Sequence, residues 1–358
     1  STNDWAQITD PDLPANCSTV IAISSYFHYI TPNSQSVVVS DVGNGRSMIA
    51  TSNFTTAISS DKLVSGISSN FLIYLMGTET TEVWYPSGQQ QGAPFDRYAR
   101  GALSYGLLAK DLKAEAFGSV YWVAKNDAGV IGLVRADESS IEPIVNRAFV
   151  QEINGYADTS DAFMWIDVYD SHVFVNMTFP SASYERGYTH SFDVTTKTWL
   201  NRETFISKDN RYIANCYLSI DNRQFIGDYQ SGKVYEVKKS LYSDNGTEIR
   251  RLAESPDLHD DHNIFSITDI EVEIEGGIGL DGGVDPGSTP QIAMQFSYDH
   301  GRTWTNKFFR NGPRVGEYNK KVGWASGGSG KTIRTRLTCS DPVNWALIRS
   351  TAVLKVHR

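Results

Sequence analysis

The sequence is poor in several features that would assign a chain to a common functional class. Only three of its 358 residues are cysteine, and Cys17, Cys216 and Cys339 are far apart, with no C-x-x-C pair. Isolated cysteines in odd number predict neither a disulfide framework nor a zinc site, and they suit a reducing bacterial cytoplasm. No stretch approaches the roughly 20 apolar residues that cross a bilayer, and no secretory leader is recognisable. Neither a membrane span nor secretion is expected.

Clustered positive charge is also missing. The formal net charge is −9, and no block of Lys or Arg interrupts the sequence. Gripping duplex DNA through its phosphates needs clustered cations, because the release of counterions supplies most of the affinity. The protein is therefore not expected to grip DNA, although an acidic surface that repels phosphate could still touch DNA as a barrier.

Catalytic and cofactor fingerprints are absent or incomplete. The segment 328–332 (GSGKT) looks like the end of a phosphate-binding loop, but Ala325 stands where the full pattern has Gly, and an alternating strand pattern follows in place of a helix. We interpret it as a hairpin turn. The segment 259–262 (HDDH) follows Pro256 in a loop, where its side chains would not converge on a metal. No catalytic, cofactor-binding or metal-binding residue is predicted.

The strongest positive signal is alternation with a period of two. Apolar Ile270, Val272 and Ile274 alternate with acidic neighbours, which is typical of a strand with one buried face. Four candidate strands follow one another at 162–169, 172–179, 187–194 and 198–204, and further turns are expected at Asp221-Asn222 and 230–232. The two-residue link Asp170-Ser171 suits a tight hairpin. Successive four-stranded meanders are typical of propeller blades, although a sandwich also uses short strands.

Helix signals are few. Ser139 and Glu142 form a possible capping box before apolar residues on one face, and Gly155 would end that helix. Residues 97–117 are rich in Ala and Leu and form a second, weaker candidate. The predicted fold class is thus all-β, a propeller-like succession of antiparallel meanders with one or two short helices.

The chain is expected to contain two regions. The polar, charged stretch 240–262 holds the predicted boundary, so that residues 1–255 form the propeller-like region and 262–358 a shorter all-β region. A Gly-rich stretch at 276–288 has the composition of a connector rather than a strand.

One local motif is complete. Residues 297–304 match the Asp box, S-x-D-x-G-x-T-W, through Ser297, Asp299, Gly301 and Trp304. Asp299 is expected to accept hydrogen bonds from turn N–H groups, Gly301 to take a positive φ, and Trp304 to pack under the hairpin. Asp boxes are frequent in sialidases, where they stabilise hairpins and do no chemistry. The Arg-Ile-Pro motif of sialidases is missing here, whereas a Tyr/Glu nucleophile pair stays open.

Several segments in order resemble one family. Residues 71–85 look like its apolar strand, small polar turn and T-E-aromatic strand, and residues 141–153 are similar to a further segment. The F-S-x-D-x-G-x-x-W hairpin at 296–304, followed by residues 316–324 and 340–346, resembles its C-terminal end. This is the family of packaged-DNA stabilisation proteins of short-tailed, lambdoid-type bacteriophages.

The family-like residues near the C-terminus are Gly316, Tyr318, Val322, Trp324 and Pro342. The sequence departs from the family pattern at Lys321, where members commonly have Arg. Members also begin well upstream of this sequence, so the resemblance leads us to expect that N-terminal strands are lacking.

The resemblance implies a structural protein of the virion and no enzyme. It implies assembly in the host cytoplasm as a ring of copies in the tail and portal region, where portal adaptor and tail needle are partners and no membrane is involved. The ring would close the DNA exit channel and retain the genome. Two alternatives stay open, a glycan- or receptor-binding tail module and, more remotely, a sialidase-like propeller glycosidase.

Overall fold

The computed structural model describes residues 6–56, 60–89, 92–138, 140–184, 186–204, 211–238, 240–261, 263–277, 279–280 and 286–357. Within these residues the chain forms two compact units. The larger comprises the described residues up to Glu203 with 211–218 and 225–235. The smaller comprises residues 204 and 219–224 and the described residues from Glu236 onward.

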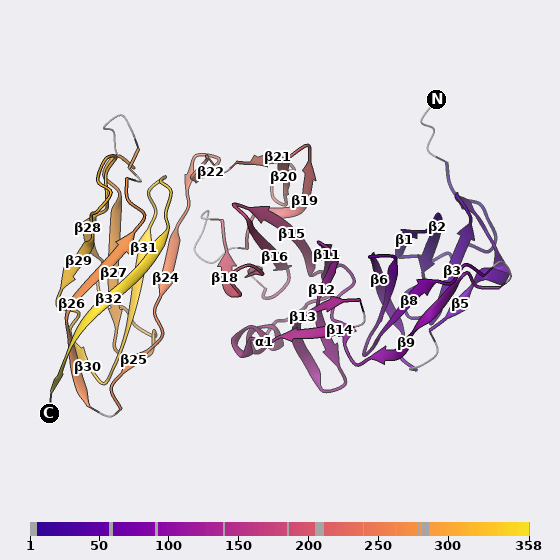
Figure 1. Ribbon diagram of the computed structural model, residues 1–358, viewed down its shortest axis with the longest axis horizontal. Coiled ribbons are helices and arrows are strands. Elements are labelled where there is room, and N and C mark those ends of the chain that lie inside the picture. Colours follow the sequence, from indigo (N-terminus) through magenta and orange to yellow (C-terminus); the bar gives the residue numbers. More distant parts are fainter. Residues whose placement is uncertain are drawn as a thin grey trace. The chain divides into compact units, whose positions relative to one another are not determined.

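The larger unit is a succession of antiparallel meanders whose strands follow one another along the chain (Figure 1). The first sheet contains β1 (Thr19–Ile23), β2 (Tyr26–Ile30), β3 (Ser36–Asp41), β4 (Asn44–Met48) and, beside β3, β5 (Phe54–Thr55). The second contains β6 (Leu63–Ser69), β7 (Leu72–Gly77), β8 (Thr81–Pro86) and β9 (Phe95–Leu103). A short 3-10 helix, η1 (Ala50–Ser52), precedes β5.

Three further meanders follow. The third sheet contains β10 (Gly106–Leu107), β11 (Lys113–Ala116), β12 (Ser119–Asn126), β13 (Gly129–Asp137) and β14 (Ser140–Ile144). The fourth contains β15 (Phe163–Tyr169), β16 (His172–Phe179), β17 (Tyr188–Asp193) and β18 (Thr198–Arg202). The three-stranded fifth contains β19 (Ala214–Ile220), β20 (Arg223–Asp228) and β21 (Val234–Val237), and its residues 219–224, 236 and 237 are counted with the smaller unit. The small pair β22 (Ser243–Asp244) and β23 (Thr247–Glu248) comes after it and belongs to the smaller unit.

Hydrophobic cores lie between successive sheets from the first to the fourth, so the central strands of the second and third sheets are buried on both faces. All of β7 is buried: Ile73 belongs to the core shared with the first sheet and Tyr74 to the core shared with the third. In β12, Trp122 faces the second sheet and Val123 the fourth. Strands covered on both faces carry continuous apolar runs rather than alternation. Meanders stacked in this way confirm the predicted all-β, propeller-like fold class.

One hairpin in each of the five meanders closes with a two-residue turn in which both residues have positive φ. These turns are Ser24–Ser25, Asn70–Phe71, Phe117–Gly118, Asp170–Ser171 and Asp221–Asn222. Two successive positive φ angles define the type I′ turn, whose twist matches that of the flanking strands. The two turns predicted at Asp170-Ser171 and Asp221-Asn222 are thereby confirmed.

The smaller unit is a sandwich of two sheets (Figure 1). One sheet contains β24 (Arg251–Glu254), β31 (Thr332–Cys339), β27 (Gln291–Ser297), β28 (Phe308–Asn311) and, beside β31, β25 (Leu258–His259). The other contains β29 (Val322–Ala325), β26 (Ile264–Ile274), β30 (Ser329–Gly330) and β32 (Leu347–His357). A single core joins the sheets, with Ile270 and Val272 of β26 packed in one cluster with Met294 and Leu337.

The one α-helix among the described residues differs in its start from the prediction. Helix α1 (Arg147–Asn154) begins after Asn146, whose Oδ1 accepts a hydrogen bond from the Phe149 N–H at 3.2 Å. The predicted capping box is wrong, because Glu142 lies in β14 and pairs with β13. Gly155 caps the C-terminal end, as predicted.

The other half of that capping box, Ser139, lies outside the described residues. The second helix predicted, over 97–117, is also wrong: this stretch holds most of β9 together with β10 and β11. Pairing of β9 with β8 and of β11 with β12 supplies hydrogen bonds that outweigh the helix propensity of Ala and Leu.

The described residues of the Gly-rich stretch 276–288 contain no strand. The predicted boundary between the two regions lies at 255–262. Strand β24 precedes this boundary in the sequence, yet it pairs with β31 and is part of the sandwich.

Candidate functional site

The Asp-box residues form a closed turn after β27. Ser297 Oγ donates to Asp299 Oδ1 at 2.8 Å and accepts from the Gly301 N–H at 2.9 Å. Asp299 also accepts from the Thr303 N–H at 2.8 Å and from Thr303 Oγ1 at 2.6 Å. Gly301 has φ +87°, and Trp304 Nε1 donates to the Gly301 carbonyl at 3.0 Å. The hydrogen bonds from Thr303 and Ser297 lower the pKa of the Asp299 carboxyl to about 2.

Ion pairs surround this hairpin. Arg334 Nε donates to Asp257 Oδ1 at 2.8 Å, and His300 Nδ1 lies 2.9 Å from Asp257 Oδ2. Hydrogen bonds from His300 and Arg334 lower the pKa of the Asp257 carboxyl. The guanidinium of Arg336 lies 3.8 Å from the ring centroid of Trp304 and pairs with Glu254. The polar atoms of the hairpin bind one another, so they stabilise this part of the sandwich rather than form a binding or catalytic site.

The family-like residues take different places in the same sandwich. Val322 and Trp324 of β29 are buried in its core, and Trp324 Nε1 donates to the Phe308 carbonyl at 2.7 Å. Gly316 has φ +85° in an open turn, Tyr318 is 74% exposed, and Pro342 is half-buried.

The Asp box contacts the chain just beyond the family-like residues 316–324. Tyr298 Oη donates to the Gly327 carbonyl at 2.9 Å, two residues beyond the end of β29. Tyr318 lies against the Gly-rich stretch, where a Cβ added to Gly277 would come within 2.7 Å of its ring. The predicted residues are therefore distributed over the sandwich rather than gathered in one pocket.

The segment 328–332 is not a hairpin turn. Ser329 and Gly330 form β30, which pairs with β26 in one sheet, and the chain then crosses at Lys331 into β31 of the other sheet. No helix N-terminus follows, so the segment cannot present a row of backbone N–H groups to a phosphate.

The metal candidate 259–262 is described only in part, because His262 lies outside the described residues. Within the described part of the chain, no group of three or more His, Cys, Asp or Glu side chains is placed to hold a metal ion. Among the same residues, no helix is long and apolar enough to span a membrane.

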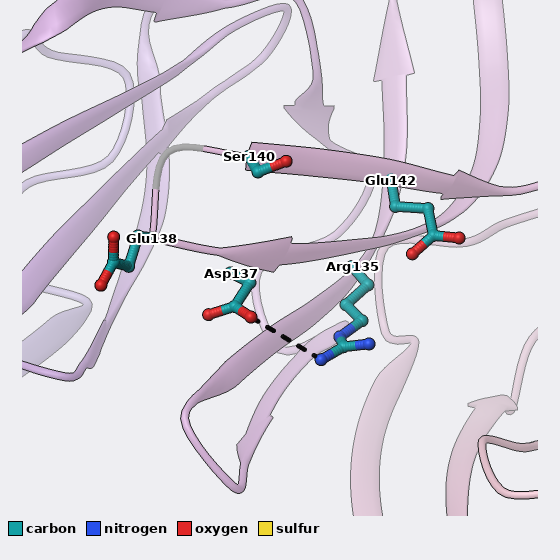
Figure 2. A pocket seen from close by; sticks show the side chains of 5 residues that line it. All are labelled: Arg135, Asp137, Glu138, Ser140 and Glu142. Atoms are coloured by element: carbon teal, nitrogen blue, oxygen red, sulfur yellow. Dashed lines mark ion pairs between the residues drawn. The ribbon is translucent and has the colours of Figure 1, made fainter.

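A shallow cavity of about 400 Å³ lies at the end of the third sheet (Figure 2). Arg135, Asp137, Glu138, Ser140 and Glu142 line it. The lining contains three carboxylates and a single guanidinium, and Arg135 Nη2 lies 3.9 Å from Asp137 Oδ2. This charge balance favours a cationic partner group over a phosphate.

A Tyr/Glu pair also exists beside helix α1. Tyr156 Oη lies 2.6 Å from His190 Nε2, which is 3.6 Å from Glu152 Oε2. Burial raises the pKa of Tyr156 and of Glu152, and it lowers the pKa of His190 to about 4. A phenol whose pKa is raised stays protonated at neutral pH, which opposes its use as a nucleophile. Tyr156 and His190 therefore form a neutral hydrogen-bonded pair, with the exposed Glu152 at its edge.

These observations define an all-β protein, in which stacked meanders of a propeller precede a sandwich and the polar motifs brace the fold. Comparison with protein families gives the same two-part division. The model described as bacteriophage P22 Gp10, beta-propeller, matches residues 1–242, and the model described as bacteriophage P22 Gp10, beta-sandwich, matches residues 250–355. The chain belongs to the bacteriophage P22 Gp10 family, and it is a phage structural protein of DNA stabilisation.

Solved structures give only distant likenesses. The structure of the Dos1 propeller is 13% identical to this chain, with a TM-score of 0.35, and the alignment covers 70% of this chain and 67% of the Dos1 chain. A glycoside hydrolase family 43 arabinoxylan arabinofuranohydrolase from Bacillus subtilis is 8% identical over 94% and 79% of the two chains, with a TM-score of 0.28. A fructofuranosidase from Schwanniomyces occidentalis is 8% identical over 96% and 95%, with a TM-score of 0.32. No curated protein sequence matches.

Proposed function

We propose that this chain is part of the tail hub, the head–tail connector of a short-tailed phage, and that it closes the DNA exit channel after packaging. It acts in the tail and portal region of the virion as a ring of copies, with a portal adaptor and a tail needle as partners. Membership of the bacteriophage P22 Gp10 family, whose two models together match most of the chain, is the observation that carries this proposal.

The packing of the larger unit supports a mechanical role. Packaged DNA pushes on whatever closes its channel, and a subunit under such a load must resist deformation. Cores between successive sheets bury both faces of β7 and β12, and close-packed interiors have low compressibility. A rigid subunit of this kind can hold a narrow opening.

The charge of the chain supports retention without binding. With a net charge of −9 and no cluster of cations, the protein repels phosphate rather than holding it. A channel wall of this character keeps DNA from adhering, so that the genome slides out once the plug is removed.

We further propose that the protein has no enzymatic activity. The Asp-box carboxylate is engaged by its own turn, and the phenol of Tyr156 is protonated at neutral pH. Neither group is then available for the two-carboxylate or tyrosine-nucleophile chemistry of glycosidases.

The test compares phage particles assembled without the protein with particles complemented by the full chain. We expect heads that fill and then expose their DNA to nuclease, with complementation restoring protection. Adsorption to host cells is measured in parallel. Heads that keep their DNA but fail to adsorb would show that the chain is a receptor- or glycan-binding tail module instead.

A further inference from the structure

Two neighbouring type I′ turns of the larger unit each present an exposed phenylalanine. Phe71 follows Asn70 between β6 and β7 and is 76% exposed, with φ +61°. Phe117 precedes Gly118 between β11 and β12 and is 78% exposed, with φ +53°. The two turns touch, because Asn70 Nδ2 donates to the Gly118 carbonyl at 3.0 Å. We call these two side chains the aromatic pair.

Both phenylalanines occupy positions that disfavour them. A bulky residue at positive φ is a genuine outlier, and it costs of the order of 1–3 kcal/mol where the surroundings impose it. The preferred I′ dipeptide is Asn-Gly. One turn already has the Asn and the other already has the Gly. In each turn the remaining position carries a large apolar side chain directed to solvent, which strains the fold and buries nothing within it.

The surroundings of the aromatic pair are acidic. Glu115 Oε1 accepts from the Gly118 N–H at 3.0 Å, so its carboxylate lies beside Phe117. Pairing of β12 with β13 brings Asp137 and Glu138, at the rim of the cavity in Figure 2, next to the same turn. Arg135 is the cation among them. Exposed aromatics with a charged rim indicate a protein contact, and this rim repels a second copy of itself.

The chain carries one strand with the complementary character. All eleven residues of β32 are exposed, and among described residues it pairs only with β26, so its outer edge is open. Its apolar side chains include Leu354 and Val356, 47% and 42% exposed although their partners in β26 are buried. Every charged or titratable residue of β32 is basic: Arg349, Lys355 and His357.

Two of these basic residues are engaged within the sandwich. Arg349 Nε donates to Glu273 at 2.6 Å, and His357 Nε2 lies 2.5 Å from Ser266 Oγ. Lys355 forms no ion pair with any described residue. Two β32 strands side by side would bring like charges together, so this edge also disfavours pairing with its own copy.

We propose that the aromatic pair of one copy docks on β32 of a second copy, with Phe71 and Phe117 against Leu354 and Val356, and Glu138 near Lys355. The contact joins two different surfaces, and a heterologous contact of this kind generates a closed ring when its rotation closes. The inference rests on the ring of the proposed function and names the surfaces that form it.

The test uses the purified full chain and measures its mass by sedimentation over a wide range of concentration. We expect the wild type to associate, and the double variant Phe71→Gly/Phe117→Asn to associate roughly 100-fold more weakly, because aromatic anchors dominate interfaces. Each substitution completes an Asn-Gly turn, so the double variant should melt no lower than the wild type. The matched control is Ser171→Gly, which makes the same change in a I′ turn without an aromatic and should associate as the wild type does.

A charge swap tests the pairing of the two surfaces. Glu138→Lys and Lys355→Glu should each weaken association about 5- to 10-fold, and a chain carrying both should recover most of it. A wild type that stays monomeric, or a double Phe variant that associates normally, overturns the contact. If the wild type forms a closed oligomer that none of these variants affects, the contact is wrong and the ring of the proposed function stands. If the particles keep their DNA without the protein, the proposed function fails whatever the sedimentation shows.

Discussion

The two units bury their central strands in different ways. In the larger unit β7 is buried at every position, because it lies between two other sheets. In the sandwich β26 alternates, with Ile270 and Val272 buried and Glu271 exposed between them. A strand covered on one face has a sequence in which apolar and polar residues alternate, whereas a strand between two sheets has a continuous apolar sequence. The difference also decides where each unit tolerates substitution.

The largest effects should come from substituting neighbouring residues in the two strands, because both neighbours are buried in β7 and only one of the two is buried in β26. We expect Ile73→Ala and Tyr74→Ala, neighbours on opposite faces of β7, each to cost about 2–5 kcal/mol of unfolding free energy. In β26, Ile270→Ala should cost a similar amount, whereas Glu271→Ala should change stability by no more than about 0.5 kcal/mol. Denaturant unfolding of the four variants checks this. Equal tolerance at Tyr74 and Glu271 would contradict the stacking of sheets on both sides of β7.

Acid should weaken the larger unit first. Burial lowers the pKa of His28 and of His190 to about 4, against about 6.5 in an unfolded chain. Between these two pH values the unfolded chain binds more protons than the folded one. The contribution of each buried histidine to stability is therefore fully present above pH 6.5 and is lost as the pH is lowered toward 4. The loss is about 3 kcal/mol for each histidine.

The Asp box of the sandwich should respond only at lower pH. The pKa of Asp299 is held at about 2, so its contribution is present above the usual aspartate pKa and is lost as the pH falls toward 2. Calorimetry at about pH 7.5 and 4.5 should show the transition of the larger unit moving further than that of the sandwich. The variant His28→Phe should reduce the shift of the larger unit. An equal shift in both transitions would contradict the greater acid sensitivity of the larger unit.

The Asp-box hairpin should give a smaller effect. Ser297 is 1% exposed and bonds both Asp299 and the Gly301 N–H. We expect Ser297→Ala to cost about 1 kcal/mol, since both bonds are lost while part of the turn remains held by Thr303. The exposed Ser350→Ala serves as control and should be neutral. Thermal denaturation measures the difference, and a neutral Ser297→Ala would remove the bracing role of the motif.

The smallest effect is expected from a surface ion pair. Arg349, 65% exposed, pairs with Glu273 across β26 and β32. Exposed pairs are worth about 0–1 kcal/mol and are screened by salt. Arg349→Gln should therefore lower stability slightly at low salt and by even less at high salt. A large, salt-independent loss would show that β32 is held more firmly than an edge strand.

Local chemistry made part of this fold predictable. The four strands expected at 162–204 agree with β15–β18 to within about two residues at each end, because alternation and a two-residue turn act over short distances. The Asp-box motif likewise specifies hydrogen bonds between near neighbours in sequence.

Non-local pairing limited the prediction elsewhere. Glu142 has the right spacing for a capping box, yet β14 pairs with β13 and delays the helix to Arg147. The Ala- and Leu-rich stretch 97–117 became strands for the same reason. Nothing in a single sequence says which distant strand will offer its hydrogen bonds.

The aromatic pair was missed at the level of the sequence. Phe71 was placed at the start of an apolar strand, although Asn70 before it is a turn residue. An apolar residue next to Asn or Gly between two strand patterns was the available signal. Only the structure shows that Phe71 is exposed and that its turn touches the turn of Phe117.

The most direct test of the central claim is the amount of chain needed to protect the genome. Purified full chain is added in graded amounts to filled particles that lack it, and nuclease-resistant DNA is measured against the chain bound per particle. A structural plug predicts protection that rises with bound chain and saturates at a fixed number of copies. Protection by far less than one chain per particle, or none at saturating binding, would contradict it.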